Sequence, residues 1–126
     1  MNDKSVEKGL AVMQAHIDAL NTHDAHSIAA TLHFPHHRLS GTTWKTWETA
    51  DHYFDDFLQR AGTDWKRSTF TDIKVIDSST NKVHLDAKIQ RYDSNNSVIS
   101  TFRSLWVIIE INGVWAAKVR SSFAID

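Results

Sequence analysis

The sequence predicts an α+β domain in which three helices come first and an antiparallel sheet follows. Up to Gly62, apolar residues recur at helical spacing. After Trp65, runs of β-branched and aromatic residues alternate with turn-like segments at 77–81, 93–97 and 112–113. The connections between these runs are too short to contain crossover helices, so neighbouring strands are expected to be antiparallel. A block of helices followed by a block of strands is typical of α+β architecture.

The whole chain is expected to form one domain. Its 126 residues are enough to bury one core, and a content of 41% apolar and 23% charged residues is typical of a globular protein. We find no linker, internal repeat or low-complexity tract in it. Residues 1–126 are therefore predicted to be a single folded unit.

The first helix is predicted over residues 4–21, and a short second helix follows it. The apolar positions of the first helix step by four, three, four and three: Val6, Leu10, Met13, Ile17 and Leu20. Asp24 is a suitable N-cap for the second helix. Because Pro35 cannot continue a helix, the second helix is expected to end near His33.

A third helix is predicted after a turn at residues 40–43 (SGTT). It should begin near Thr49 and end at Gly62, a residue type that often terminates helices. Its apolar face comprises Ala50, Tyr53, Phe54, Phe57, Leu58 and Ala61. Near the other end of the chain, Asn112-Gly113 lies between two apolar runs and predicts a tight hairpin.

Composition argues against several classes of function. The net charge is −1 and the basic residues are scattered, so no nucleic-acid partner is expected. The longest apolar run, LWVII, is far shorter than the roughly 20 residues that span a bilayer, so no membrane partner is expected either. With no cysteine, no glycine-rich phosphate loop and no signal-peptide pattern, we expect a cytoplasmic protein without a cofactor.

Three histidines surround the single proline in the segment LHFPHHRL, residues 32–39. His33 and His37 have i,i+4 spacing, but Pro35 breaks the helix that would align them. His36 and His37 are neighbours in an extended segment and point to opposite faces. We therefore predict no metal site here. His36 should face inward with Arg38, His37 should face outward, and His33 should complete the preceding helix.

The order of elements and two segments resemble the NTF2-like superfamily. The segments are HIDALNTHDAHSIAATL (residues 16–32) and IEINGVWAAKVRSSFA (residues 109–124). The superfamily includes SnoaL-like polyketide cyclases and ketosteroid isomerases. The resemblance implies an NTF2-like cone, in which three N-terminal helices pack into a curved antiparallel sheet around a pocket. It also implies a homodimer formed through the outer face of the sheet.

Alternation along the last two strands assigns their faces. In the last strand, one set is expected inside the cone: Trp115, Ala117, Val119, Ser121 and Phe123. In the strand before it both faces are apolar. If the face with Val107 is the inner one, Arg103 points toward the pocket mouth. The other face, with Phe102, Trp106 and Ile108, then forms a candidate dimer interface, unless C-terminal residues fold over it.

His16, Ser40 and Arg103 are the candidate catalytic residues. His16 lies within the apolar arc of the first helix, where it could be a core residue. The resemblance instead implies that His16 occupies the position of the isomerase tyrosine, which donates a hydrogen bond to the oxyanion of the reaction. Arg103 could bind a ligand carboxylate or enolate, or pair with a helix carboxylate. Further residues are expected to line the ligand pocket: Leu20, Arg38, Trp44, Trp47, Tyr53, Phe57, Trp115 and Phe123.

The ketosteroid isomerase mechanism itself does not carry over. The position of its aspartate base falls at Ser40, and that of its protonated aspartate falls near Val107. Two functions remain open. One is a cofactor-free isomerase-, cyclase- or dehydratase-like enzyme that acts on a small apolar carbonyl or carboxylate compound. The other is a non-catalytic binding or dimerisation module of the same fold.

Overall fold

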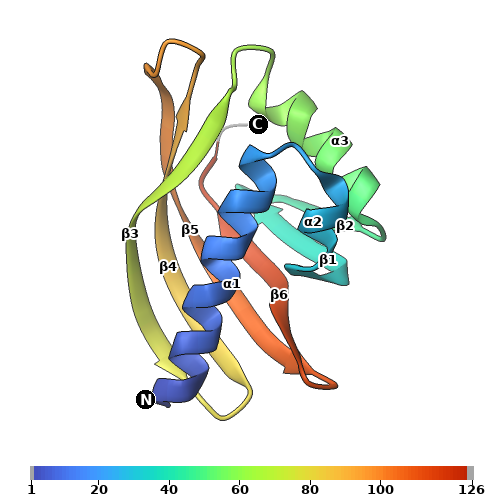
Figure 1. The fold of residues 1–126 in the computed structure, drawn as a ribbon, viewed down its shortest axis with the longest axis vertical. Helices are drawn as coiled ribbons and strands as arrows, with labels where there is room; N and C mark the ends of the chain where they lie inside the picture. Colours follow the sequence, from blue (N-terminus) through green and yellow to red (C-terminus); the bar gives the residue numbers. More distant parts are fainter. Residues whose placement is uncertain (1, 125–126) are drawn as a thin grey trace.

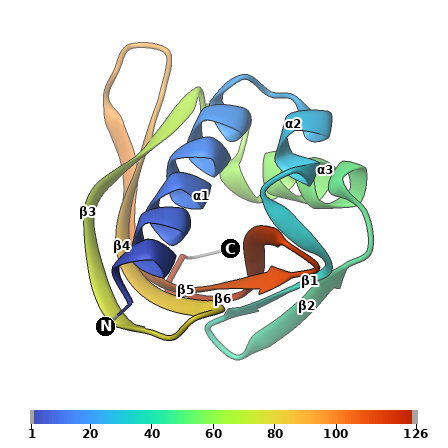
Figure 2. The same ribbon diagram turned by 60° about the horizontal axis from the view of Figure 1, so that its bottom comes forward.

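The computed structural model describes residues 2–124 and shows a six-stranded sheet that curves around one long helix (Figures 1 and 2). The elements follow in the order α1 (Asp3–Asn21), α2 (Ala25–Ala29), β1 (Leu32–Ser40), β2 (Thr43–Trp47), α3 (Ala50–Ala61), β3 (Arg67–Ser78), β4 (Lys82–Tyr92), β5 (Val98–Ile111) and β6 (Val114–Ser122). The strand order is β2-β1-β6-β5-β4-β3. Helix α1 lies against the inner face of the sheet, with α2 and α3 beside it (Figure 2).

Helix α1 forms where its apolar spacing predicts it. The Asn2 side chain caps the helix by accepting a hydrogen bond from the Ser5 amide at 3.0 Å. The inner face of the helix packs on the sheet, and Gly9 allows the closest approach. A Cβ at Gly9 would lie 3.2 Å from the side chain of Val83 in β4. The absence of a side chain there therefore sets the distance between helix and sheet.

Helix α2 begins at its predicted N-cap, Asp24, and α3 begins where predicted, with Thr49 as its N-cap. Helix α2 ends at Ala29, before the predicted end at His33, because β1 already pairs with β6 from Leu32 onward. Residues 40–43 form the expected turn, but a strand that we did not predict, β2, follows it. Two strands thus separate α3 from α2, and the prediction that all three helices precede the sheet is wrong.

The sheet is mixed rather than purely antiparallel. Strand β1 runs parallel to β6, whereas the other neighbouring pairs are antiparallel. The chain between β1 and β6 contains a helix and four strands, so the short-connection argument does not apply to this pair. The register shifts in β3–β4, β4–β5, β5–β6 and β1–β6. Such irregularities bend and twist strands, which accounts for the curvature around α1.

The face of β5 that we predicted to be inside is the outer one. Strand β4 has a single apolar face, and its pairing places Leu85 beside Trp106 and Ala87 beside Ser104. Trp106 is 2% exposed and Ile108 is fully buried. The candidate dimer interface formed by these residues and Phe102 is therefore wrong, because that face packs inside the monomer. Arg103 consequently lies outside.

A bulge reverses the predicted faces within β6. Ile108 pairs with Ala117 but Val107 pairs with Val119, so Lys118 is an extra residue. Ala117, before the bulge, is buried as expected. Beyond the bulge, Arg120 and Ser122 face inward, whereas Phe123, just past the strand, is 77% exposed. The predicted inner positions of Val119, Ser121 and Phe123 are therefore wrong.

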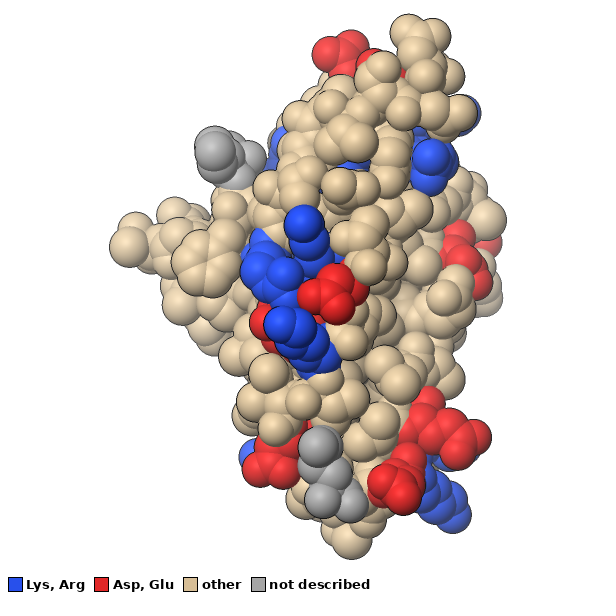
Figure 3. Space-filling model, turned by 90° about the vertical axis from the view of Figure 1, so that its left-hand side faces the viewer, with Lys and Arg blue, Asp and Glu red and all other residues tan. Residues whose placement is uncertain are grey.

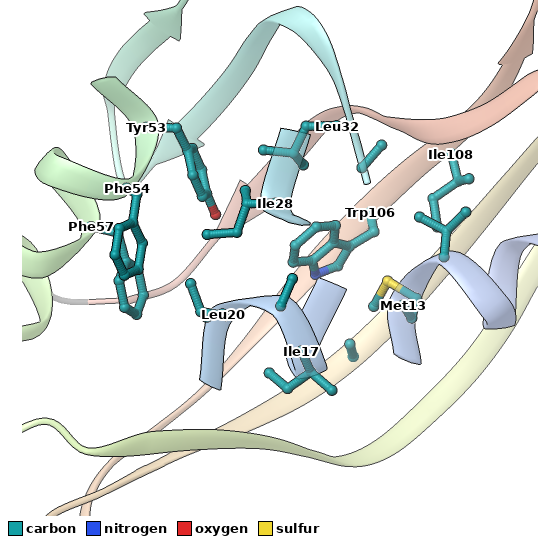
Figure 4. Close-up of a cluster of buried hydrophobic side chains, with 14 of the residues drawn as sticks. Met13, Ile17, Leu20, Ile28, Leu32, Tyr53, Phe54, Phe57, Trp106 and Ile108 are labelled. Carbon is teal, nitrogen blue, oxygen red and sulfur yellow. The ribbon is translucent and has the colours of Figure 1, made fainter. Parts of the chain in front are cut away.

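The core lies between α1, α3 and the inner face of the sheet. Figure 4 shows Trp106 at its centre, with Met13 and Ile17 of α1 on one side and Ile28 and Leu32 on another. Tyr53 and Phe57 of α3 complete the far side of this cluster. Within residues 2–124, no helix is both long enough and apolar enough to span a bilayer.

Candidate functional site

A small cavity of about 30 Å³ lies between α1, α3 and the inner face of the sheet. Its apolar wall contains Phe57 from α3, Phe70 from β3, and Phe102 and Trp106 from β5. Helix α1 contributes His16, Ile17 and Leu20 to the lining. A single water needs about 10–15 Å³ of such space, so the cavity has room for about two waters or one small polar group.

Four arginines line this cavity, and each comes from a different element. Arg38 is in β1, Arg60 in α3, Arg91 in β4 and Arg120 in β6. Arg38 is 1% exposed, Arg91 6% and Arg120 8%. The lining residues described within 2–124 include no aspartate or glutamate. Arginine is one of the residue types least often buried, so four arginines around one cavity are unusual.

Aromatic rings hold three of these guanidinium groups in place. The Arg120 guanidinium carbon lies 4.9 Å from the centre of the Trp106 ring. That of Arg91 lies 4.7 Å from the centre of the Phe102 ring, and that of Arg60 lies 5.6 Å from the centre of the Phe57 ring. The ring faces attract the cations and fix the planes of the guanidinium groups. Outside the cavity lining, the carboxylate of Asp56 accepts a hydrogen bond from Arg60 Nε at 2.9 Å.

Several polar atoms at the cavity have no hydrogen-bond partner among the described residues. They are Nη1 and Nη2 of Arg60, Nε of Arg120 and Nε2 of His16. Burial lowers the pKa of Arg120 to about 10; the Tyr53 hydroxyl opposes this shift, and the charges of Arg38 and Arg60 add to it. Arg120 therefore remains a cation at neutral pH. Unpaired buried donors and acceptors are costly and uncommon, so these atoms make the cavity the candidate site.

His16 is a neutral hydrogen-bond acceptor in the cavity wall. The Thr31 hydroxyl donates to the carbonyl of Ile28 at 2.8 Å, and His16 Nδ1 lies 2.9 Å from the same hydroxyl oxygen. Nδ1 must therefore donate its proton to Thr31, which leaves Nε2 with a free lone pair. Burial, aided by the charge of Arg120, lowers the pKa of His16 to about 3. His16 is consequently a poor base at neutral pH.

His36, the inward-facing histidine of the proline segment, lies behind the cavity wall. Its Nδ1 donates to the carbonyl of Ala117 at 3.0 Å, and its ring contacts those of Trp47 and Tyr53. Burial and then the charge of Arg120 lower the pKa of His36 to about 2. The predicted inward orientation of His36 is confirmed by its complete burial. The imidazole acts as a structural donor between β1 and β6.

The other two histidines of that segment have separate roles. His37 faces outward as predicted, where its Nδ1 lies 2.9 Å from Thr46 Oγ1 and Trp44 stacks on its ring. His33 does not complete a helix, because it lies within β1. Its Nε2 bonds to the carbonyl of Ile109 at 2.9 Å. Among the described residues, no group of three or more His, Asp or Glu side chains could hold a metal ion.

Of the three candidate catalytic residues, His16 alone lines the cavity. The Ser40 hydroxyl donates instead to the carbonyl of Ala124 at 3.1 Å. Arg103 lies on the outer face of the sheet, 39% exposed, and pairs with Asp86 at 3.2 Å and Asp72 at 3.3 Å. The alternative that Arg103 pairs with carboxylates therefore applies, although these belong to strands and not to helices.

The predicted pocket residues also divide into separate groups. Those that line the cavity are Leu20, Arg38 and Phe57. Trp47 and Tyr53 are buried beside it without lining it. Trp44 is 57% exposed on β2, and Phe123 is exposed beyond the β6 bulge. Trp115 lies at the opposite end of α1, near Asn2. The predicted pocket residues therefore include three that line the cavity and others that lie beside it, at the surface or at the far end of α1.

Sequence reasoning missed Arg60, Arg91 and Arg120. The inward position of Arg91 could have been predicted, because Arg91 continues the alternation that places Leu85 and Ile89 on the inner face of β4. Arg60 lies three residues after Phe57, on the same side of α3. The inward position of Arg120 depends on the bulge at Lys118, and no local feature of the sequence marks that bulge.

No protein-family model and no curated protein matches this sequence. Solved structures do match its fold. An NTF2-like protein from Cytophaga hutchinsonii aligns with a TM-score of 0.73 at 19% identity, covering 99% of this chain and 100% of that protein. A protein of unknown function with a cystatin-like fold from Nostoc punctiforme aligns with a TM-score of 0.79 at 9% identity, covering 99% and 94%.

A third match is a candidate dehydratase of the NTF2-like family from Streptomyces avermitilis. It has a TM-score of 0.74 at 10% identity and covers 98% of both chains. The chain therefore has the NTF2-like, cystatin-like fold that its sequence resembles. At these identities the likeness concerns the fold alone, and the activity has to be argued from the site.

Proposed function

We propose that this chain is a small-molecule-binding domain whose ligand occupies the arginine-lined cavity. The observation that carries the proposal is the set of buried polar atoms at the cavity that have no hydrogen-bond partner among residues 2–124: Arg60 Nη1 and Nη2, Arg120 Nε and His16 Nε2. A protein that used this region only for packing would gain stability from apolar residues there. Cavities with an apolar wall and a few convergent polar groups are the usual form of small-molecule sites.

The state of His16 favours binding over acid–base catalysis. A general base works best when its pKa lies near the working pH, whereas that of His16 is about 3. Its free nitrogen is an acceptor, so it does not provide the oxyanion donor that the isomerase resemblance implies. The imidazole is suited to accept one hydrogen bond from a bound molecule. This supports a binding module rather than an isomerase-, cyclase- or dehydratase-like enzyme.

A pair of size variants of α1 tests the site. Leu20→Phe adds volume at a residue that lines the cavity, and Leu10→Phe makes the same change at an exposed position. We expect some members of a set of small acids, alcohols and amides to shift the Trp106 indole NMR signal in the wild type and in Leu10→Phe, but not in Leu20→Phe. If no compound binds, or if Leu20→Phe binds equally well, the cavity is not the site.

The second part of the proposal is a homodimer formed through the outer face of the sheet. On β5 this face presents exposed Leu105 and Ile111, with half-buried Val107 and Ile109 between them. Figure 3 looks onto the β3–β4 side of the sheet, where charged side chains gather in a group near the middle and most of the remaining surface is uncharged. A second copy could cover the apolar residues of β5 on this face isologously. The check is the mass of the protein in dilute solution.

A further inference from the structure

The hydrogen-bonding groups at the cavity are mainly donors. Arg60 and Arg120 present guanidinium N–H groups with no partner among residues 2–124. The Arg60 side chain is 4% exposed and Arg120 is 8% exposed. A guanidinium group has donors and no acceptor, so only an acceptor or a negative charge can satisfy it. The lining described within 2–124 contains no carboxylate, and Asp56, outside the lining, pairs with Arg60 through Nε and leaves both Nη groups unpartnered within 2–124.

Two serines add further donors. The Ser68 oxygen accepts from Trp65 Nε1 at 2.9 Å, and the Ser104 oxygen accepts from Trp106 Nε1 at 2.8 Å. Both serines line the cavity and are almost completely buried. Each hydroxyl oxygen accepts from an indole N–H and still has its own hydrogen, which it can donate to a ligand. The unpartnered lone pair of His16 Nε2 is the exception to this excess of donors.

We infer that the ligand is a small organic anion whose carboxylate enters the cavity between Arg60 and Arg120. This inference rests on the proposed function and names the chemical class of the ligand. The planar fork of a guanidinium group matches the two oxygens of a carboxylate, and such pairs are strong where water is excluded. The carbon part of the ligand would meet the rings of Phe70 and Phe102. A hydroxyl or amine on it could donate to His16.

The size of the cavity supports a carboxylate group at its inner end. The volume of about 30 Å³ admits a group the size of two waters. A larger carbon skeleton would have to extend from the cavity or displace ring side chains on entry. Short-chain and single-ring carboxylic acids are therefore the appropriate probes. A negative charge would also relieve the mutual repulsion of the guanidinium groups.

Two pairs of isosteric probes isolate the charge: acetate against acetamide, and benzoate against benzamide. Each is titrated into the full chain at pH 7.5, with sodium chloride matching the ionic strength, and followed by calorimetry and thermal unfolding. We expect at least one carboxylate to bind and to raise the melting temperature, with at least tenfold weaker binding of its amide. Equal binding of acid and amide would overturn the inference while leaving the proposed small-molecule site intact.

Arginine variants locate the charge. Arg120→Met removes a buried cation without a carboxylate partner and should leave the melting temperature of the ligand-free chain equal or higher, while abolishing the response to the carboxylate. Arg120→Lys should retain part of the response, because the charge remains without the fork. Arg103→Met, on the outer face, is the matched control and should respond like the wild type. A normal carboxylate response in Arg120→Met would contradict the inference.

A variant without carboxylates at its last residue tests another source of negative charge in the chain. Ile125 and Asp126 lie outside the described residues. Asp126→Asn with an amidated C-terminus removes both carboxylates of Asp126, whereas a chain cut at Ala124 would gain a new one. We expect the amidated variant to bind the carboxylate probes about as well as the full chain does. If neither carboxylate binds the full chain but one binds the amidated variant, Asp126 supplies the charge and the inference is wrong. If neither protein binds any carboxylate, the inference is also wrong.

Discussion

The two faces of β5 contain similar residues but lie in opposite environments. On the inner face Phe102, Ser104 and Trp106 line the cavity, whereas on the outer face Arg103 and Leu105 are each more than a third exposed. Each face has apolar side chains and polar ones, so hydrophobicity alone does not distinguish them. The pairing with β4 does, because β4 has a single apolar face that must meet α1. The environment of a residue in β5 is therefore decided by a neighbouring strand.

Arg103 and Arg120 show the same contrast for a charged group. Arg103 is 39% exposed and pairs with two carboxylates. Arg120 is 8% exposed and lies over the rings of Trp106 and Tyr53, and its Nε has no hydrogen-bond partner within the described part of the chain. An exposed ion pair contributes about 0–1 kcal/mol, whereas a buried cation without an anion is a cost to folding. The ion pairs of Arg103 give it a structural role on the outer face, whereas Arg120 is the residue on which the proposed binding site depends.

The largest expected effect comes from truncating the inner face of β5. Trp106→Ala should lower the free energy of unfolding by about 3–5 kcal/mol, because it leaves a cavity at the centre of the core. Leu105→Ala, on the outer face, should cost less than about 1 kcal/mol in the monomer. Urea unfolding of both variants measures the difference. Similar small losses in both would contradict the assignment of the faces.

A second effect follows from the buried histidines. Burial and Arg120 hold the pKa of His16 at about 3 and that of His36 at about 2 in the folded chain, against an ordinary value of 6.5. At pH values below 6.5 but above these folded-state pKa values, the unfolded chain binds protons on both histidines that the folded chain does not bind. Stability is therefore fully present above pH 6.5 and falls as the pH drops toward 3. At pH 5 each of the two histidines should lower the free energy of unfolding by about 2 kcal/mol.

Unfolding measurements at pH 7 and pH 5 check this dependence. His16→Gln and His36→Gln should each remove about half of the stability lost between the two pH values. His84→Gln, on the outer face of β4, is the matched control variant. If both glutamine variants keep the wild-type pH dependence, the imidazoles are not the buried neutral groups that the structure indicates.

The smallest expected effect on stability concerns the outer face. Leu105→Glu should change the free energy of unfolding of the monomer by less than about 1 kcal/mol. It should nevertheless reduce the mass in solution from twice 14.4 kDa to that of a single chain. Leu10→Glu, at an exposed position of α1, should leave the dimer intact. A wild-type mass of one chain in dilute solution would end the dimer proposal.

Much of the local structure was predictable from the sequence. The N-cap residues Asp24 and Thr49 begin α2 and α3 as expected, and Asn112-Gly113 forms the expected hairpin with positive φ angles of 52° and 81°. Of the candidate site, His16 was correctly placed at the cavity. Arg103 was misplaced because both faces of its strand are apolar, so alternation alone left the inner face undecided.

By itself, the sequence determined the helices, their caps, the tight hairpin and the inner face of β4. These features depend on residues that are close together in the chain. The tertiary structure decided which face of β5 is inside, that β1 runs parallel to β6, and that Arg120 points into the cavity. Each of these depends on pairing between distant strands, and one extra residue such as Lys118 moves every later side chain of its strand to the opposite face.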